Sequence, residues 1–253
     1  IVGEALELNA RIQDEVRERY GFAEHATSSS WPLPDTTYVR LHLDAANATL
    51  NDNPPSTEAI AEYDSLSQDG RATFGYRFAR DTRLVGHLRL RLQVSATADD
   101  MDLFAVLEKL DPSGMLVGFA HYAVFEDGPV AVGWLRASHR ELDLEHSTDW
   151  LPILKHAREV KLIPQTVTSV DIEILPTGTI FEAGSTLRLV VTGRDYCQYP
   201  KPMLYARHED TVNLGPHRIH TGGSFESWLQ IPVSAANAPG PPTASSHETA
   251  TAG

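Results

Sequence analysis

Two observations on the sequence predict an all-β fold, specifically a jelly-roll β-sandwich. Apolar and polar residues alternate in several short segments between residues 31 and 234, as they do in strands that bury one face. Almost no helical periodicity separates these segments, so strand follows strand along the chain. About nine such segments are typical of an antiparallel sandwich or jelly roll.

The predicted strands follow from their patterns. In LVGHLRLRLQVSA, leucine and valine occupy one face and polar residues the other, and SVDIEIL and TLRLVVTG repeat this alternation. MDLFAVLEKL is apolar on both faces, which indicates a central strand that is covered on both sides. The predicted strands are residues 37–43, 73–79, 84–96, 101–110, 117–125, 130–138, 169–175, 186–193 and 227–233.

The two ends of the chain differ from this pattern. Near the start, apolar residues recur every four positions, which favours an amphipathic helix over residues 4–20. We therefore expect residues 1–30 to form a helical or irregular segment, a remnant or linker, and residues 31–234 to form the sandwich. Residues 235–253 are small, polar and rich in proline, so we expect a disordered tail. Because the chain begins with Ile1 rather than methionine, we interpret it as a fragment or a trimmed product.

Composition excludes several classes of function. The net charge of −13 repels phosphate backbones, so we expect no nucleic-acid partner. The single cysteine, Cys197, allows neither an intrachain disulfide nor a cysteine-based zinc site. The apolar runs are far shorter than the ~20 residues that cross a bilayer. We expect no membrane partner, and the absence of a signal peptide favours the cytoplasm.

One long segment, residues 194–226, has no clear periodicity and contains two prolines near Tyr199. Long irregular loops in compact domains are usually functional or interfacial. We expect the stretch from Arg194 to His220 to form part of a domain interface or a pocket wall. Its candidate binding residues are Tyr196, Tyr199, Tyr205, Arg207, His208 and His220.

The four tryptophans could together form a sugar-stacking platform. Trp134 and Trp228 lie inside predicted strands, so we expect both of them to pack in the core. Trp150 lies in a predicted loop and stays a candidate binding residue.

Ser224 lies in GGSFE, close to the G-x-S-x-G nucleophile elbow. An elbow needs a small residue at its fifth position and a helix after the serine. Here Glu226 occupies that position and a predicted strand follows. We therefore predict a glycine-rich turn and no nucleophile.

Two groups of residues have side chains that could ligate a metal. Asp99, Asp100 and Asp102 resemble part of a calcium loop but lack the glycine and the distal glutamate of an EF-hand. The histidines and acidic residues between His208 and His220 offer mixed nitrogen and oxygen ligands. A turn that enters a strand accounts better for the three aspartates, and a solvated or hydrogen-bonded loop accounts better for the second group. We therefore predict no metal.

Several stretches together resemble a known family. They are WPLPDTTYVRLHLDAANATL, DDMDLFAVLEKLDPSG, GWLRASHRELD, VDIEILPTGTIFEAGSTLRLVVTGRD and HTGGSFESWLQIPV. In order and without large gaps from Trp31 to Val233, they are similar to the C-terminal region of the CocE/NonD hydrolases. This group includes cocaine-esterase-type enzymes and X-Pro dipeptidyl-peptidases.

The resemblance implies a jelly roll similar to galactose-binding-like domains, packed on an α/β-hydrolase domain that holds the catalytic serine, aspartate and histidine. None of these maps onto this sequence, so we assign no catalytic residue and no cofactor and expect the chain alone to be inactive. The favoured function is a non-catalytic domain that helps shape the pocket of an ester- or amide-cleaving serine hydrolase, in cis or in trans. An independent carbohydrate-binding module is the alternative, and homo-oligomerisation stays open.

Overall fold

The computed structural model describes residues 27–120, 127–196, 208 and 210–234. The predicted helix over residues 4–20 and the predicted tail lie outside these residues. The elements are β1 (Thr36–Asp44), β2 (Thr49–Asn51), β3 (Ala59–Asp64), β4 (Arg71–Arg77), β5 (Thr82–Ala96), β6 (Asp102–Leu110), β7 (Leu116–Val117), β8 (Phe119–Ala120), β9 (Asp127–Gly128), β10 (Ala131–Arg136), the 3₁₀ helix η1 (Ala137–His139), β11 (Thr168–Phe181), β12 (Thr186–Thr192), β13 (Pro216–Thr221) and β14 (Trp228–Ser234).

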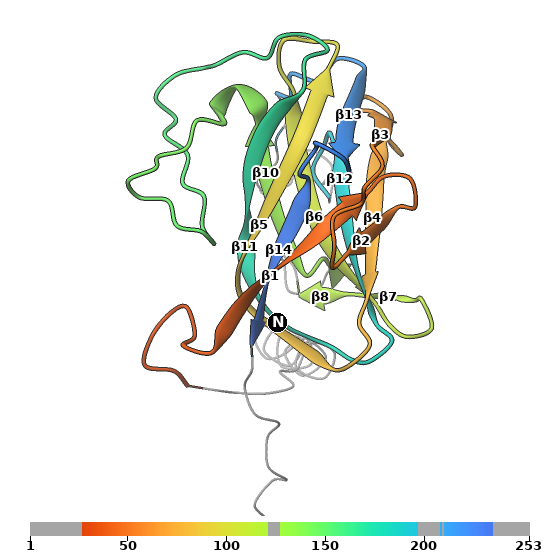
Figure 1. Ribbon diagram of the computed structural model, residues 1–253, viewed down its shortest axis with the longest axis vertical. Coiled ribbons are helices and arrows are strands. Elements are labelled where there is room, and N and C mark those ends of the chain that lie inside the picture. Colours follow the sequence, from red (N-terminus) through yellow and green to blue (C-terminus); the bar gives the residue numbers. More distant parts are fainter. Residues whose placement is uncertain (1–26, 121–126, 197–207, 209, 235–253) are drawn as a thin grey trace, which may run out of the picture.

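The strands form two layers that enclose one core (Figure 1). In the first layer the long β5 is central, with β11 along one edge and with β14 and β13 along the other. β1 pairs with β14, and β3 pairs with β13. The second layer has the order β10-β6-β12-β4-β2. The three-residue strand β2 joins the layers because it also pairs with β1.

The core consists of the inward faces of both layers. The alternation predicted for β5 is confirmed, because Leu88, Leu90 and Leu92 are fully buried there. The prediction for residues 101–110 is also confirmed. β6 lies between β10 and β12, and all of its residues except Leu110 are buried. The prediction of an all-β sandwich is thus confirmed, whereas the galactose-binding-like subtype stays a prediction.

The structure corrects the prediction that residues 194–226 form a loop without strands. β13 lies inside this segment and pairs with β5 on one side and β3 on the other. Its His217 and Ile219 are fully buried. β2 and β3 were also absent from the predicted strands. The described part of the chain contains no helix that is long and apolar enough to cross a membrane.

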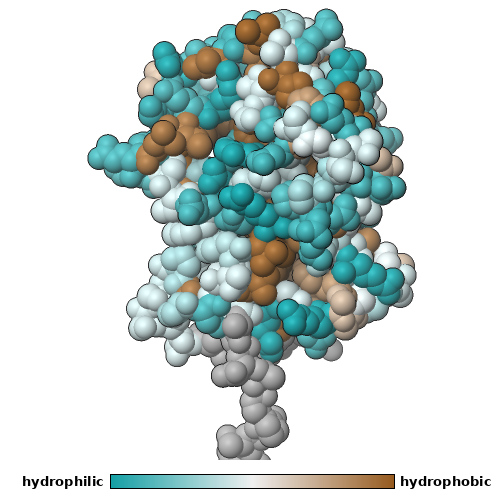
Figure 2. All heavy atoms as spheres, in the orientation of Figure 1, coloured by the Kyte–Doolittle hydropathy of each residue, from teal (hydrophilic) through white to brown (hydrophobic). Residues whose placement is uncertain are grey.

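The outer face of the first layer carries a cluster of arginines around Trp228. The guanidinium of Arg40 lies 4.4 Å from the centre of the Trp228 ring, and those of Arg89 and Arg91 lie 5.6 and 5.5 Å away. Asp171 on β11 accepts hydrogen bonds from Arg89 and Arg91. Figure 2 shows this face, with hydrophilic side chains over β5 and β14 and several apolar ones near the upper end. Trp228 is buried as predicted, at 2% exposed, but it lies beneath these arginines on the outer face and not in the core cluster, where it was expected.

Candidate functional site: a groove along β10 and β11

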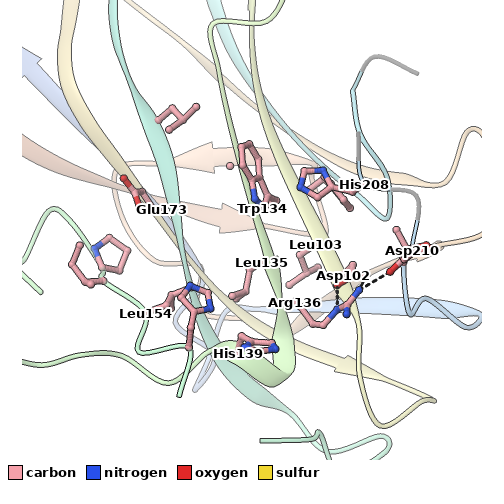
Figure 3. Close-up of a pocket in the computed structure, with 17 residues that line it drawn as sticks. Asp102, Leu103, Trp134, Leu135, Arg136, His139, Leu154, Glu173, His208 and Asp210 are labelled. Atoms are coloured by element: carbon pink, nitrogen blue, oxygen red, sulfur yellow. Dashed lines mark hydrogen bonds and ion pairs between the residues drawn. The ribbon is translucent and has the colours of Figure 1, made fainter. Parts of the chain in front are cut away.

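A groove of about 790 Å³ lies where the edges of the two layers meet. β10 and the first residues of β6 form its floor, and β11 and the loop after η1 form one side. The other side is formed by His208, Asp210 and Thr211. In Figure 3, Glu173 lies on the left of the groove, Asp210 lies on the right, and Trp134 lies between them.

Gly133 allows β10 and β11 to come close together. A Cβ atom at this position would lie 2.1 Å from the carbonyl oxygen of Glu173, so no larger residue fits without a shift of the backbone. The two layers therefore approach each other here, and the next residue of β10, Trp134, points outward into the groove. This local geometry depends on one glycine.

Trp134 is 43% exposed, so the prediction that it packs in the core is wrong. The residues of β10 alternate, and Ala131, Gly133 and Leu135 face inward while Trp134 faces out. Leu175 of β11, which is 46% exposed, also lines the groove. The groove thus presents apolar surface to the solvent.

His208 is held in place by Asp195. Its backbone N–H donates to Asp195 Oδ2 at 2.7 Å, and its Nδ1 lies 2.8 Å from Asp195 Oδ1. Because a carboxylate only accepts, Nδ1 carries the proton, and Nε2 of the neutral ring is then an acceptor. The imidazole packs against Phe104 and Trp134, with ring centres 5.3 and 5.1 Å apart.

Arg136 forms an ion pair inside the groove. Its Nε and Nη2 donate to the two carboxylate oxygens of Asp102 at 2.8 and 3.0 Å. Nη2 also donates to the backbone carbonyl of Asp210 at 2.7 Å, and this bond anchors the far side of the groove (Figure 3). The hydrogen bonds to Asp102 raise the pKa of Arg136, so its charge is permanent.

Two other carboxylates of the groove have no comparable partner. The side chain of Glu173 is 41% exposed, and its only ion-pair contact in the described part of the chain is with His87 Nδ1, at 4.0 Å. Asp210 is exposed, and no described residue donates a hydrogen bond to its carboxylate. The groove therefore combines an exposed indole with carboxylates that are free to bind a ligand.

The structure brings only some of the predicted site residues together. His208 lines the groove. Tyr196 is half-buried at the end of the described stretch before it. Tyr199, Tyr205 and Arg207 lie outside the described residues. Their role in binding stays a prediction.

Trp150 and His220 lie elsewhere. Trp150 stacks on Tyr38, with ring centres 6.1 Å apart and an interplanar angle of 9°, and it also contacts His87 on the outer face of the first layer. His220 is 7% exposed, and its Nε2 lies 2.8 Å from Ser95 Oγ. His220 therefore exposes little surface, and its role in binding stays a prediction. Glu173 and Asp210 were not among the predicted binding residues.

Ser224 occupies a tight turn before β14, as predicted. Gly222 has a φ of 75°, and a Cβ there would lie 2.0 Å from the carbonyl oxygen of Thr57. The Ser224 hydroxyl donates to Glu58 Oε1 at 3.0 Å. No described histidine contacts it, and a strand follows instead of a helix.

Asp100 and Asp102 anchor the entry to β6. Asp100 accepts from the backbone N–H groups of Met101 and Ser138 and from Lys161 Nζ. Burial opposes its ionisation, but these hydrogen bonds outweigh burial and lower the pKa of Asp100. Among the described residues, no group of three or more histidine, cysteine or acidic side chains could hold a metal ion.

Comparison with known proteins places the chain in a family. The profile of the X-Pro dipeptidyl-peptidase C-terminal non-catalytic domain matches residues 11–230. The chain belongs to this family. The predicted resemblance to the C-terminal region of CocE/NonD hydrolases is confirmed, and the match begins about twenty residues before Trp31, where the predicted likeness began.

Solved structures agree with this assignment. A CocE/NonD family hydrolase from Staphylococcus aureus is 43% identical, with a TM-score of 0.83 over 87% of this chain and 40% of the hydrolase. An α-amino acid ester hydrolase is 14% identical, with a TM-score of 0.53 over 77% of this chain and 36% of that chain, and shows the same fold.

The chain is much shorter than its curated relatives. Two proteins from Mycobacterium bovis and Mycobacterium tuberculosis, each bearing the name of a serine esterase, are 22% identical to it over 241 residues. The matched region is 82% of this chain and 35% of each relative, so the chain spans about a third of their length.

Proposed function

We propose that this chain is the non-catalytic β-domain of a serine hydrolase that cleaves ester or amide bonds, and that its groove packs on the α/β-hydrolase domain. The observation that carries the proposal is the exposure of Trp134 and Leu175 in one groove of a domain from this family. Exposed apolar side chains gathered in a concave surface mark interaction sites. Covered by the hydrolase domain, the groove would form part of a wall of the substrate pocket.

The hydrogen bonds of His208 and Asp210 support this placement. Arg136 and Asp195 fix the positions of Asp210 and His208 beside Trp134. Groups already held by hydrogen bonds lose less conformational entropy when a partner binds. The comparisons do not favour an independent carbohydrate-binding module, and one face of the Trp150 ring is already stacked on Tyr38.

Binding between separately expressed parts tests the proposal. The hydrolase part of the parent enzyme is titrated with this chain by calorimetry, and then with the double variant Trp134→Ser, Leu175→Ser. We expect the Kd to rise by at least about tenfold, since central aromatic residues dominate interface energy.

The matched control is Leu66→Ser, which removes a 60% exposed leucine outside the groove and should leave the Kd unchanged. Equal melting temperatures would show that the variants fold. The proposal fails if the wild-type chain does not bind, or if the groove variant binds as tightly as the wild type.

A further inference from the structure

We propose that the groove binds a cationic side chain, a lysine or an arginine of the hydrolase domain. This inference rests on the proposed function, because it names the chemistry of the group that enters the groove. The argument depends on the charges of the lining, on the exposed indole and on the orientation of His208.

The charge of the lining favours a cation. Asp102, Glu173 and Asp210 contribute three carboxylates, whereas Arg136 contributes the single guanidinium among the described lining residues. With neutral histidines the net charge is −2. Arg136 uses three of its five N–H donors on Asp102 and the Asp210 carbonyl, and its charge is paired with that of Asp102. Among the described lining residues, the one guanidinium is already paired with a carboxylate, whereas Glu173 and Asp210 have no comparable partner, so the lining favours a cationic ligand over an anionic one.

Trp134 adds a second attraction for the same class of ligand. The indole ring carries negative charge density on its face and attracts ammonium and guanidinium groups within about 6 Å. The same chain already uses this interaction, since the guanidinium of Arg40 lies 4.4 Å from the centre of the Trp228 ring. Trp134 is exposed and contacts no arginine or lysine in the described part of the chain.

The remaining groups fit a long basic side chain. Leu175 and Leu154 offer apolar contact for an aliphatic stem. In Figure 3, Glu173 lies on one side of Trp134, and Asp210 lies on the other side, beyond His208; either carboxylate can accept hydrogen bonds from a charged tip. In the neutral form of His208, Nε2 is a further acceptor, because Asp195 holds the proton on Nδ1.

A small cation tests the groove without the partner. The ¹⁵N-labelled chain is titrated with n-butylguanidinium chloride, and the four indole N–H signals are followed by NMR. We expect one indole signal, absent in Trp134→Leu, to shift with a Kd on the order of 10 mM. The uncharged n-butylurea should bind at least about fivefold more weakly.

Glu173→Gln should raise this Kd by about three- to tenfold, because it keeps the shape and removes the charge. The matched control, Asp69→Asn, removes a charge whose side chain is 93% exposed outside the groove and should change nothing. The proposal is overturned if the cation does not shift the Trp134 signal, if butylurea binds equally well, or if Glu173→Gln has no effect.

The hydrolase part is also titrated with the Glu173→Gln variant of this chain. This experiment distinguishes failure of the cationic occupant from failure of the docking function. Weaker binding than with the wild-type chain supports a cationic occupant. If Trp134→Ser weakens binding and Glu173→Gln does not, the docking function stands and the cationic occupant is wrong. If the wild-type chain itself does not bind the hydrolase part, the docking function is wrong. The cationic occupant is then wrong as well, even if butylguanidinium binds in the groove.

Discussion

At the scale of single residues, Gly133 determines how the groove forms. Its missing side chain lets β10 approach the Glu173 carbonyl, and Trp134 then faces the solvent. Gly133→Ala should lower the free energy of unfolding by about 1–3 kcal/mol, because the new methyl group overlaps backbone atoms. Urea unfolding followed by tryptophan fluorescence measures the change.

Gly178 in β11 provides the matched control. A Cβ there meets no atom within 4 Å, so Gly178→Ala should leave stability within about 0.5 kcal/mol of the wild type. Equal losses in both variants would contradict the account of Gly133.

His217 is a second residue with a measurable consequence. It is fully buried, and its Nδ1 lies 3.2 Å from the Tyr63 hydroxyl. Burial lowers its pKa to about 4, from about 6.5 in an unfolded chain. Between these values the unfolded chain binds more protons than the folded one. Stability is therefore complete above pH 6.5 and falls as the pH drops toward 4.

The folded domain should lose about 3 kcal/mol between pH 7 and pH 4 through this histidine. His217→Gln should remove that part of the pH dependence, whatever its effect at pH 7. Urea unfolding of both proteins at several pH values measures the difference. Parallel stability curves for wild type and variant would show that His217 does not titrate in this way.

At the scale of elements, sequence patterns predicted the strands whose alternation is strong, such as β5, β11, β12 and β14. β13 was missed because PHRIHT contains a single aliphatic residue and buries histidines, so its pattern resembles a polar loop. β3 was missed because Ile60 points outward and is 54% exposed. Period-2 patterns fail where polar side chains face inward and apolar ones face out.

The groove was harder to predict than the strands. His208 was found because it lies in a long polar segment, but Glu173 looked like any outward residue of an alternating strand. Trp134 looked like a core residue, because sequence alone does not show that the outer face of β10 borders a groove. Proximity between β10 and β11 is a tertiary property, and the only local signal for it is Gly133.

The connection between β5 and β6 allows a test for metal. Asp100 and Asp102 direct their oxygens to backbone N–H groups, Lys161 and Arg136. We therefore expect EDTA to leave the melting temperature within about 1 °C of its value in buffer, because a metal bound only to the folded state would stabilise it by mass action. A fall of several degrees, reversed by adding calcium or zinc, would contradict this expectation.

At the scale of the whole molecule, no complete hydrolase triad is present among the described residues. Ser95 Oγ lies 2.8 Å from His220 Nε2, but this pair is buried and no described acidic side chain hydrogen-bonds to His220, while Ser224 bonds to Glu58. The isolated chain should therefore not hydrolyse p-nitrophenyl acetate or an X-Pro anilide above the buffer rate. Ser224→Ala should behave in the same way as the wild type. Turnover that disappears in Ser224→Ala would contradict this account.

Amide hydrogen exchange with and without the hydrolase part tests the central claim most directly. If the groove is the docking surface, amides of β10 and of residues 208–214 gain protection when the hydrolase part binds. Amides of β3, which lies at the far edge of the sheet order, should exchange unchanged. Protection confined to β3 or to the arginine face around Trp228, with none along β10, would show that the domain docks through another surface.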